Sequence, residues 1–231
     1  MKQQKIAINY KFLTFFAMLI ITCKIFSMLF AQRIFLLFNS PLPGGIFAFC
    51  MIFMLLDIIT NNYGYKNARK IIVLTLLCET IFALLVFTGL IIIPSSMFKL
   101  ETSYILIFTS YYDIFIASFI ATIIAFTLNC YVFSKLYYSF NGKHLWLRCI
   151  LSTALGELIF SIIWTFIFFK NKLNFDLINH IVLNQYLFKV LFEVATLPIT
   201  YLIIYLLDKF ELRTDIEYKG FTPLYKTIKK Q

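Results

Sequence analysis

Long apolar stretches with few charges recur along the whole chain, and they constrain its fold more than any other feature. Hydrophobic residues make up 61% of the 231 residues and charged residues only 14%, a balance that a soluble domain of this length could not hide from water. A helix of about 20 apolar residues is long enough to cross a bilayer. We therefore predict an all-α, polytopic integral membrane protein that forms one domain over residues 1–231.

Six stretches are long enough, or nearly long enough, to be membrane spans. They cover approximately residues 12–31, 45–60, 71–93, 104–133, 145–169 and 183–207. The second is short, and the fourth is longer than a bilayer requires, so we expect the fourth to tilt, kink or project beyond the membrane. Residues 208–231 are predicted to form a solvated cytoplasmic tail.

Basic residues are distributed unevenly between the two ends of these stretches. Most of the 21 Lys and Arg residues lie in the N-terminal segment, in the loops after the second and fourth stretches (the latter taken to include Arg148) and in the tail. The opposite loops hold Arg33, Lys99, Lys170 and Lys172. Because basic loops stay in the cytoplasm, both termini are predicted to be cytoplasmic. The C-terminal sequence LYKTIKKQ (224–231) has a secondary interpretation as a lipid-binding surface.

Signatures of catalysis, cofactor binding and nucleotide hydrolysis are missing from the sequence. It contains no Walker A loop, no GxGxxG after a strand, no HExxH and no GxSxG. The five cysteines show no ligand spacing and are interpreted as buried thiols. We therefore expect neither an enzyme nor a resident cofactor or metal. The basic excess is interpreted as a topology signal, so no nucleic-acid partner is expected.

Ionisable residues within the apolar stretches are the candidate functional residues, because charges at bilayer depth usually face a bundle interior or a water-filled cavity. They are Lys24, Asp57, Glu79, Asp113, Glu157, Lys189 and Glu193. Asp57 and Asp113 also have a purely structural interpretation near the ends of their stretches. Glu79 has the alternative of pairing with a neighbouring lysine.

Glu157, Lys189 and Glu193 are the strongest of these candidates. Glu157 and Glu193 lie near the middle of their stretches. Lys189 and Glu193 are four residues apart and therefore share one helix face, but Lys before Glu is the weaker order for such a pair. A further partner for Lys189, such as Glu157 or a ligand, is therefore expected. A structural ion network is the alternative.

Four motifs occur in register with the predicted spans. They are DIITNNYGYKNARKII (57–72), IASFIAT (116–122) with the following VFSKL (132–136), LSTALGEL (151–158) and FKVLFEVATLPITYL (188–202). Together they resemble the queuosine precursor transporter family, whose members are vitamin-uptake-type membrane proteins related in fold to the substrate-binding subunits of energy-coupling-factor importers. The resemblance extends over about residues 12–210 and rests most directly on Asp57, Glu157 and Lys189.

The resemblance implies import of a deazaguanine precursor of queuosine, or of the base queuine, across the bacterial inner membrane. On this basis Asp57, Glu157 and Lys189 are predicted to contact the substrate. Lys24 and Glu193 are predicted to do so as charges within the spans, and Glu157, Lys189 and Glu193 have proton exchange as an alternative role. A carboxylate can accept two N–H bonds from a guanine-like edge, and a lysine can donate to its carbonyl. Asp57 and Arg69 are predicted to form a cytoplasmic gate.

Several polar positions depart from the family pattern. The substrate could therefore be a related small planar compound instead of a queuosine precursor. Lys24 and Asn61 stand where the family often has Asn and Glu. Two other functions fit the same sequence. One is the substrate-binding subunit of an energy-coupling-factor vitamin importer, which would need partner subunits, and the other is a non-transporting membrane scaffold. The sequence also allows the protein to form a homo-oligomer.

Overall fold

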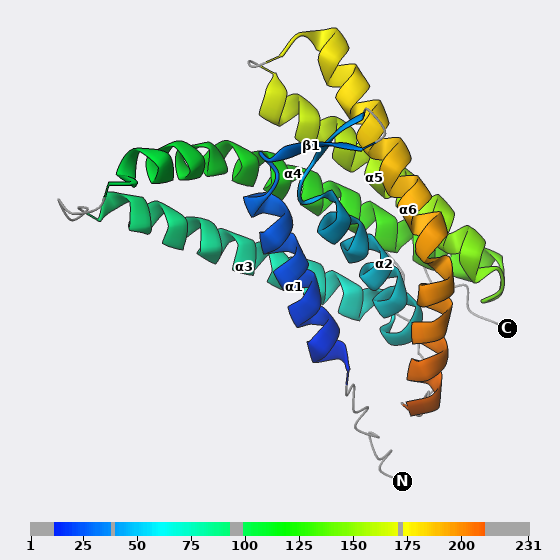
Figure 1. Cartoon of the computed structure of the whole chain (residues 1–231). Helices are drawn as coiled ribbons and strands as arrows, with labels where there is room; N and C mark the ends of the chain where they lie inside the picture. Colours follow the sequence, from blue (N-terminus) through cyan, green and yellow to red (C-terminus); the bar gives the residue numbers. More distant parts are fainter. Residues whose placement is uncertain (1–11, 38–39, 93–98, 171–172, 211–231) are drawn as a thin grey trace, which may run out of the picture.

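The computed structural model describes residues 12–37, 40–92, 99–170 and 173–210, which fold into six helices and one two-stranded hairpin (Figure 1). The elements are α1 (Leu13–Leu29), β1 (Ile34–Leu37), β2 (Ser40–Pro43), α2 (Ile46–Tyr63), α3 (Tyr65–Ile91), α4 (Glu101–Ser139), α5 (Leu145–Phe169) and α6 (Phe175–Phe210). The N-terminal lysines, most of the tail and the sequence LYKTIKKQ lie outside the described residues.

The helices have the length and composition of membrane spans. Five of them, α2 to α6, are long and apolar enough to cross a bilayer, and α1 is a shorter apolar helix of 17 residues. Large apolar side chains are exposed on their outward faces, for example Leu77, Leu84 and Ile91 on α3. Such faces would be unfavourable in water but match lipid tails. The protein is therefore a multi-pass helical membrane protein, whereas the sixth span and the cytoplasmic termini stay predictions.

Several helices are longer than their apolar stretches. α3 begins at Tyr65, six residues before the predicted boundary, and α6 begins at Phe175 rather than at residue 183. The additional turns contain polar residues that lower the local hydropathy but are compatible with a helix. α4 is one helix of 39 residues, about 58 Å at 1.5 Å per residue, which exceeds a hydrocarbon core of about 30 Å.

The β1–β2 hairpin was not predicted, and it is the exception to the all-α expectation. Its antiparallel register pairs Ile34 with Pro43 and Leu37 with Ser40. A two-stranded ribbon tolerates prolines because each strand has a free edge. Leu42 packs with Ile46 and Cys50 at the start of α2, so the hairpin covers that end of the helix.

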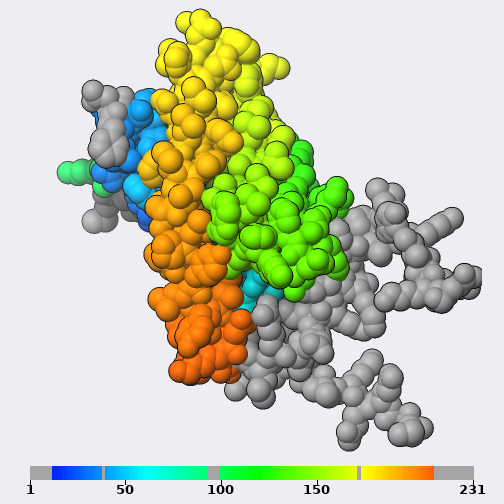
Figure 2. Space-filling view, turned by 90° about the vertical axis from the view of Figure 1, so that its right-hand side faces the viewer, coloured from blue at the N-terminus to red at the C-terminus, as the bar shows by residue number. Residues whose placement is uncertain are grey.

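α2 is the central helix of the bundle. Of its span, 78% is buried, and it contacts α1, α3, α4, α5 and α6. α4 runs beside α3 in one part of its length and contacts α5 as well, and the α3–α4 and α5–α6 pairs diverge from each other (Figure 1). Figure 2 shows α6 and α5 side by side on one face of the molecule. Side chains on α2 therefore face the interior of the bundle.

Two glycines allow close helix crossings at the centre. A Cβ atom at Gly45 would overlap the backbone of Ser27, with the Ser27 Cα atom only 2.6 Å away, so α1 meets the start of α2 there. A Cβ atom at Gly156 would lie 2.8 Å from the Phe53 ring and 3.0 Å from the Asn129 Cβ atom. Small residues at such crossings bring helix backbones together in membrane proteins.

Replacement of Gly45 by alanine is therefore expected to destabilise the protein. The added methyl group must displace the Ser27 backbone, and overpacking of this kind costs about 1–3 kcal/mol. Thermal unfolding of the purified protein in detergent should show a lower Tm. Gly89→Ala is the matched control because nothing lies within 4 Å of the position that its added methyl group would occupy, and an equal Tm loss in both variants would contradict the crossing.

Candidate functional site

Helical periodicity aligns the polar residues of α5 and α6 toward the interior. On α5, Cys149, Thr153, Glu157 and Ser161 follow one another at four-residue intervals, and all are buried. On α6, Gln185, Lys189 and Glu193 have the same spacing and are also buried. Residues four apart lie on one helix face. Each helix therefore contributes one continuous polar stripe to the bundle interior.

Lys189 and Glu157 form a buried ion pair between these stripes. The Lys189 Nζ atom lies 2.9 Å from Glu157 Oε2 and donates to the Ser161 hydroxyl at 3.2 Å. Both charged side chains are almost completely inaccessible to solvent. The expected partner of Lys189 is therefore confirmed as Glu157. The pair is held between α5 and α6, and not along α6 by Glu193.

Two aromatic rings face the Lys189 ammonium group. The centroids of Phe49 and Phe160 lie 4.2 Å apart, and the Lys189 Nζ atom lies 4.5 Å and 4.7 Å from them. The Lys24 Nζ atom lies 5.5 Å from each of the same two rings. These distances fall within the range of attractive cation–π contacts. The two rings thus lie next to both buried lysines.

Lys24 has polar partners of its own on the opposite side. Its Nζ atom donates to Ser118 and Thr122 on α4, both at 2.6 Å, and lies 3.9 Å from Glu79 Oε2 on α3. The alternative in which Glu79 pairs with a neighbouring lysine is confirmed. Lys24 therefore pairs with Glu79 rather than with Glu193 in the described part of the chain.

A cavity of about 40 Å³ lies beside the Lys189 ammonium group. It is bounded by α1, α2, α4, α5, α6 and the segment that joins the hairpin to α2. Phe49, Phe160 and Lys189 line it together with the polar side chains of Ser118 and Gln185. This volume accommodates a few water molecules. The cavity combines ring faces, hydrogen-bond donors and acceptors and one ammonium group.

Asp57 and Glu193 belong to a second cluster, one turn of α6 beyond Lys189. Ligand atoms of Asp57, Cys149 and Glu193 lie within 4.8 Å of one another, and all three side chains are buried. The Ser152 hydroxyl donates to Asp57 Oδ2 at 3.4 Å. Asp57 is completely buried, which differs from a water-facing position at the end of a span. The five predicted substrate contacts therefore fall into separate groups.

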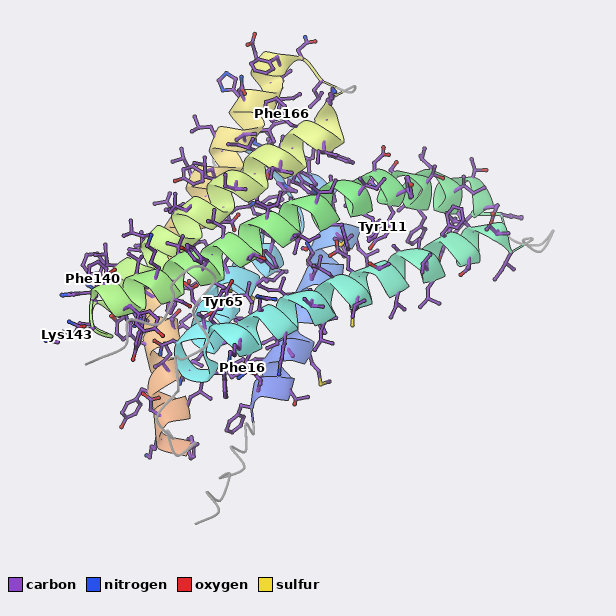
Figure 3. All side chains as sticks on the ribbon, turned by 180° about the vertical axis from the view of Figure 1, so that it is seen from behind. Phe16, Tyr65, Tyr111, Phe140, Lys143 and Phe166 are labelled. Carbon is purple, nitrogen blue, oxygen red and sulfur yellow. The ribbon has the colours of Figure 1, made fainter. Side chains whose placement is uncertain are left out.

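The two predicted gate residues differ in burial. Asp57 is buried, whereas Arg69 is exposed on α3. Arg69 interacts with Tyr65, which lies in the first turn of that helix and is labelled in Figure 3. The arginine that interacts with Asp57 electrostatically is Arg148. The Asp57–Arg69 gate stays a prediction. Asp113 is exposed and belongs to neither cluster.

Arg148 is a buried residue that sequence reasoning assigned to a loop. It donates to Asn61 Oδ1 at 3.1 Å, and its guanidinium carbon lies 4.8 Å from the rings of both Phe133 and Tyr137. Its position four residues into the fifth apolar stretch was the available signal. Phe49 and Phe160 were missed for a different reason, since nothing distinguishes them among 28 phenylalanines.

A bundle of membrane-spanning helices around a cavity with buried charges is the architecture of a membrane transporter. Residues 43–203 match the family described as "Putative vitamin uptake transporter", and the chain belongs to this family. A protein of Bacillus subtilis (strain 168) named "Probable queuosine precursor transporter" is 31% identical over 170 residues, which cover 71% of this chain and 72% of that protein. No solved structure gives a significant match.

The comparisons confirm the resemblance drawn from the four motifs. The matched residues include Asp57, Glu157, Lys189 and Glu193, whereas Lys24 on α1 lies before them. A transporter family also makes a catalytic function unnecessary to explain the buried charges. The chain is therefore a transporter, and its substrate is a separate question.

Removal of one partner of the Lys189–Glu157 pair should be strongly destabilising. Lys189→Met leaves a buried carboxylate without its cation, which costs about 3–5 kcal/mol. Because Glu157→Gln removes the same interaction, the double variant should lose less free energy of unfolding than the two single losses combined, with a coupling of about 0.5–3 kcal/mol.

Reversible unfolding in detergent micelles would measure this coupling. Lys189→Met combined with Asp113→Asn is the control pair, since Asp113 is exposed and outside both clusters. Additive losses are expected for the control pair. Additive losses for Lys189 and Glu157 would contradict a direct interaction between them.

Proposed function

We propose that the protein imports a queuosine precursor, a deazaguanine base or queuine, or a related small planar compound, and binds it in the cavity beside Lys189. The observation that carries this proposal is the position of the Lys189–Glu157 pair against two aromatic rings at the cavity. The family and the name of the Bacillus relative support the substrate class. The membrane would be the inner membrane of a bacterium.

The chemistry of the cavity suits a planar heterocycle with donors on one edge and a carbonyl group. Glu157 Oε1 is buried and has no hydrogen-bond partner among the described residues, so it can accept an N–H bond from a ligand. Lys189 can donate to a carbonyl oxygen. The faces of Phe49 and Phe160 offer stacking surfaces, which contribute about 0.5–1.5 kcal/mol per aromatic pair beyond burial.

Entry of such a compound requires the cavity to widen. Its volume of about 40 Å³ holds a few water molecules, which is less than a bicyclic base needs. Pro43 and Gly45, at the junction of the hairpin and α2, line the cavity. Under the predicted orientation this junction lies in the outer half of the membrane. Displacement of the β1–β2 hairpin would then open the cavity to the outside, and separation of the helices would open it to the cytoplasm.

Uptake of labelled queuine and its deazaguanine precursors in a strain that depends on salvage tests this function. The wild-type protein should support uptake, and Lys189→Met and Glu157→Gln should abolish it because each removes a substrate contact. Asp113→Asn, at an exposed position outside the cavity, should transport as the wild type does.

Each failure of this experiment has a separate meaning. If the wild-type protein imports none of these compounds, the substrate assignment is wrong. If Lys189→Met imports them normally, the site assignment is wrong. Uptake that stops on ATP depletion while ion gradients persist would favour the energy-coupling-factor subunit instead.

A further inference from the structure

The buried charges of the bundle do not balance. Among the described residues, seven ionisable Lys, Arg, Asp and Glu side chains are buried: Lys24, Lys189, Arg148, Asp57, Glu79, Glu157 and Glu193. Three are basic and four are acidic, so the interior carries one excess negative charge if all are ionised. An uncompensated charge in a low-dielectric interior costs several kcal/mol. One further positive charge is therefore needed to balance the interior.

The excess charge belongs to Asp57 and Glu193. Lys24 pairs with Glu79, and Lys189 pairs with Glu157. Arg148 interacts with Asp57 but also donates to Asn61 and packs against two rings. Asp57 and Glu193 come from different helices, α2 and α6, yet their carboxylate oxygens lie within 4.8 Å of each other. Like charges this close and this buried repel each other strongly.

Polar atoms around the two carboxylates lack well-aligned hydrogen bonds. Glu193 Oε1 is buried and has no hydrogen-bond partner among the described residues, and Asp57 Oδ1 is buried next to Cys149 and Asn129 without a well-aligned hydrogen bond to either. The Asn129 side chain on α4 is completely buried and lies against Asp57, and its amide nitrogen makes no well-aligned hydrogen bond among the described residues. Buried polar atoms are nearly always satisfied, so these atoms are available to bind a cation.

Apart from Arg148, the described parts of the surrounding helices supply no basic side chain to the Asp57–Glu193 pair. The ionisable groups that face it are Cys50 from α2, Cys130 from α4, Arg148, Cys149 and Glu157 from α5, and Lys189 from α6. Thiols carry no positive charge, and Arg148 is already counted among the three basic side chains. Lys189 is bound to Glu157, and Lys24 lies with Glu79 on the side of α1 and α3. The helices as described therefore supply no compensating charge, and a cation from solution would provide it.

We propose that Asp57 and Glu193 form a binding site for one monovalent cation, a proton or a sodium ion, with Asn129 and Ser152 as neighbouring polar groups. The site is distinct from the substrate cavity, because it lies one turn of α6 beyond Lys189. A single positive charge balances the interior, whereas a divalent ion would leave an excess positive charge unless Cys149 lost its proton.

This site is placed to couple cation binding to transport, a role that rests on the proposed function. Lys189 and Glu193 lie on one face of α6, and Glu193 also interacts electrostatically with Glu157. A movement of α6 on substrate binding would change the distance between Glu193 and Asp57 on α2. Substrate occupancy and cation affinity would therefore depend on each other.

Infrared spectroscopy and ion-dependent thermal unfolding of the purified protein test the site without a substrate. A proton in the site gives the C=O band of a buried carboxylic acid at neutral pH, and Glu193→Gln and Asp57→Asn should each remove it. A sodium ion in the site gives no such band but a rise of Tm with NaCl over matched KCl, which the same variants should abolish. Asp113→Asn is the control and should leave either signal unchanged.

The remaining outcomes overturn the proposal. If the wild-type protein shows neither the acid band nor a sodium-dependent Tm, no monovalent cation binds there. A signal that persists in both variants places the cation elsewhere. Stabilisation by ZnCl₂ that depends on Cys149, together with the absence of both monovalent signals, identifies a divalent metal site instead. Since the band and the sodium dependence are measured on the wild-type protein, they are informative even if a variant fails to fold.

The coupling role has its own experiment in vesicles loaded with imposed pH or sodium gradients. Labelled queuine should accumulate several-fold more with the inward gradient of the ion that the spectroscopic test identifies, and Glu193→Gln should remove that dependence. Uptake that ignores both gradients would refute coupling while leaving the transport function intact. Absence of uptake under every gradient would refute the proposed function, and the cation site would still be decided by the infrared and unfolding measurements.

Discussion

The cost of burying charge is the constraint on which the interior of this protein depends. Lys189 and Glu157 can lie within the bundle only because they neutralise each other at 2.9 Å, and their pairing fixes α5 against α6. Lys24 likewise joins α1 to α3 through its ion pair with Glu79, and joins α1 to α4 through hydrogen bonds to Ser118 and Thr122. The polar contacts therefore connect the helices around α2, while lipid-facing residues are free to be uniformly apolar.

The Lys189–Glu157 pair and the Asp57–Glu193 pair lie in two regions of the interior that differ in their chemistry. Near the hairpin, ring faces and an ammonium group surround a small cavity, which suits recognition of a planar molecule. One turn further along α6, two carboxylates face each other with too little positive charge between them. Because Lys189 and Glu193 share a helix face, one displacement of α6 would alter both regions. This connection offers a physical basis for linking substrate binding to an ion without a nucleotide-binding motif.

The sequence predicted the parts of the structure that follow from period and charge. The apolar stretches located the helices, and the rarity of intramembrane charge identified Glu157 and Lys189, which the structure brings together. Partners that depend on tertiary contact were not predictable. Phe49 and Phe160 become distinctive only through the lysines they face, and Arg148 reads as a loop residue until its burial is known. Helix ends and the β1–β2 hairpin were missed because short polar or proline-containing segments carry little periodic signal.

Direct binding to the cavity tests the central claim most simply. Trp164 lines the cavity and is one of two tryptophans, so in a Trp146→Phe background its fluorescence reports on occupancy. Titration of the purified protein with queuine or its deazaguanine precursors should give a saturable change in Trp164 emission, and Lys189→Met should eliminate it. A saturable change of the same affinity in Lys189→Met, or no change at any concentration in the parent protein, would contradict substrate binding beside Lys189.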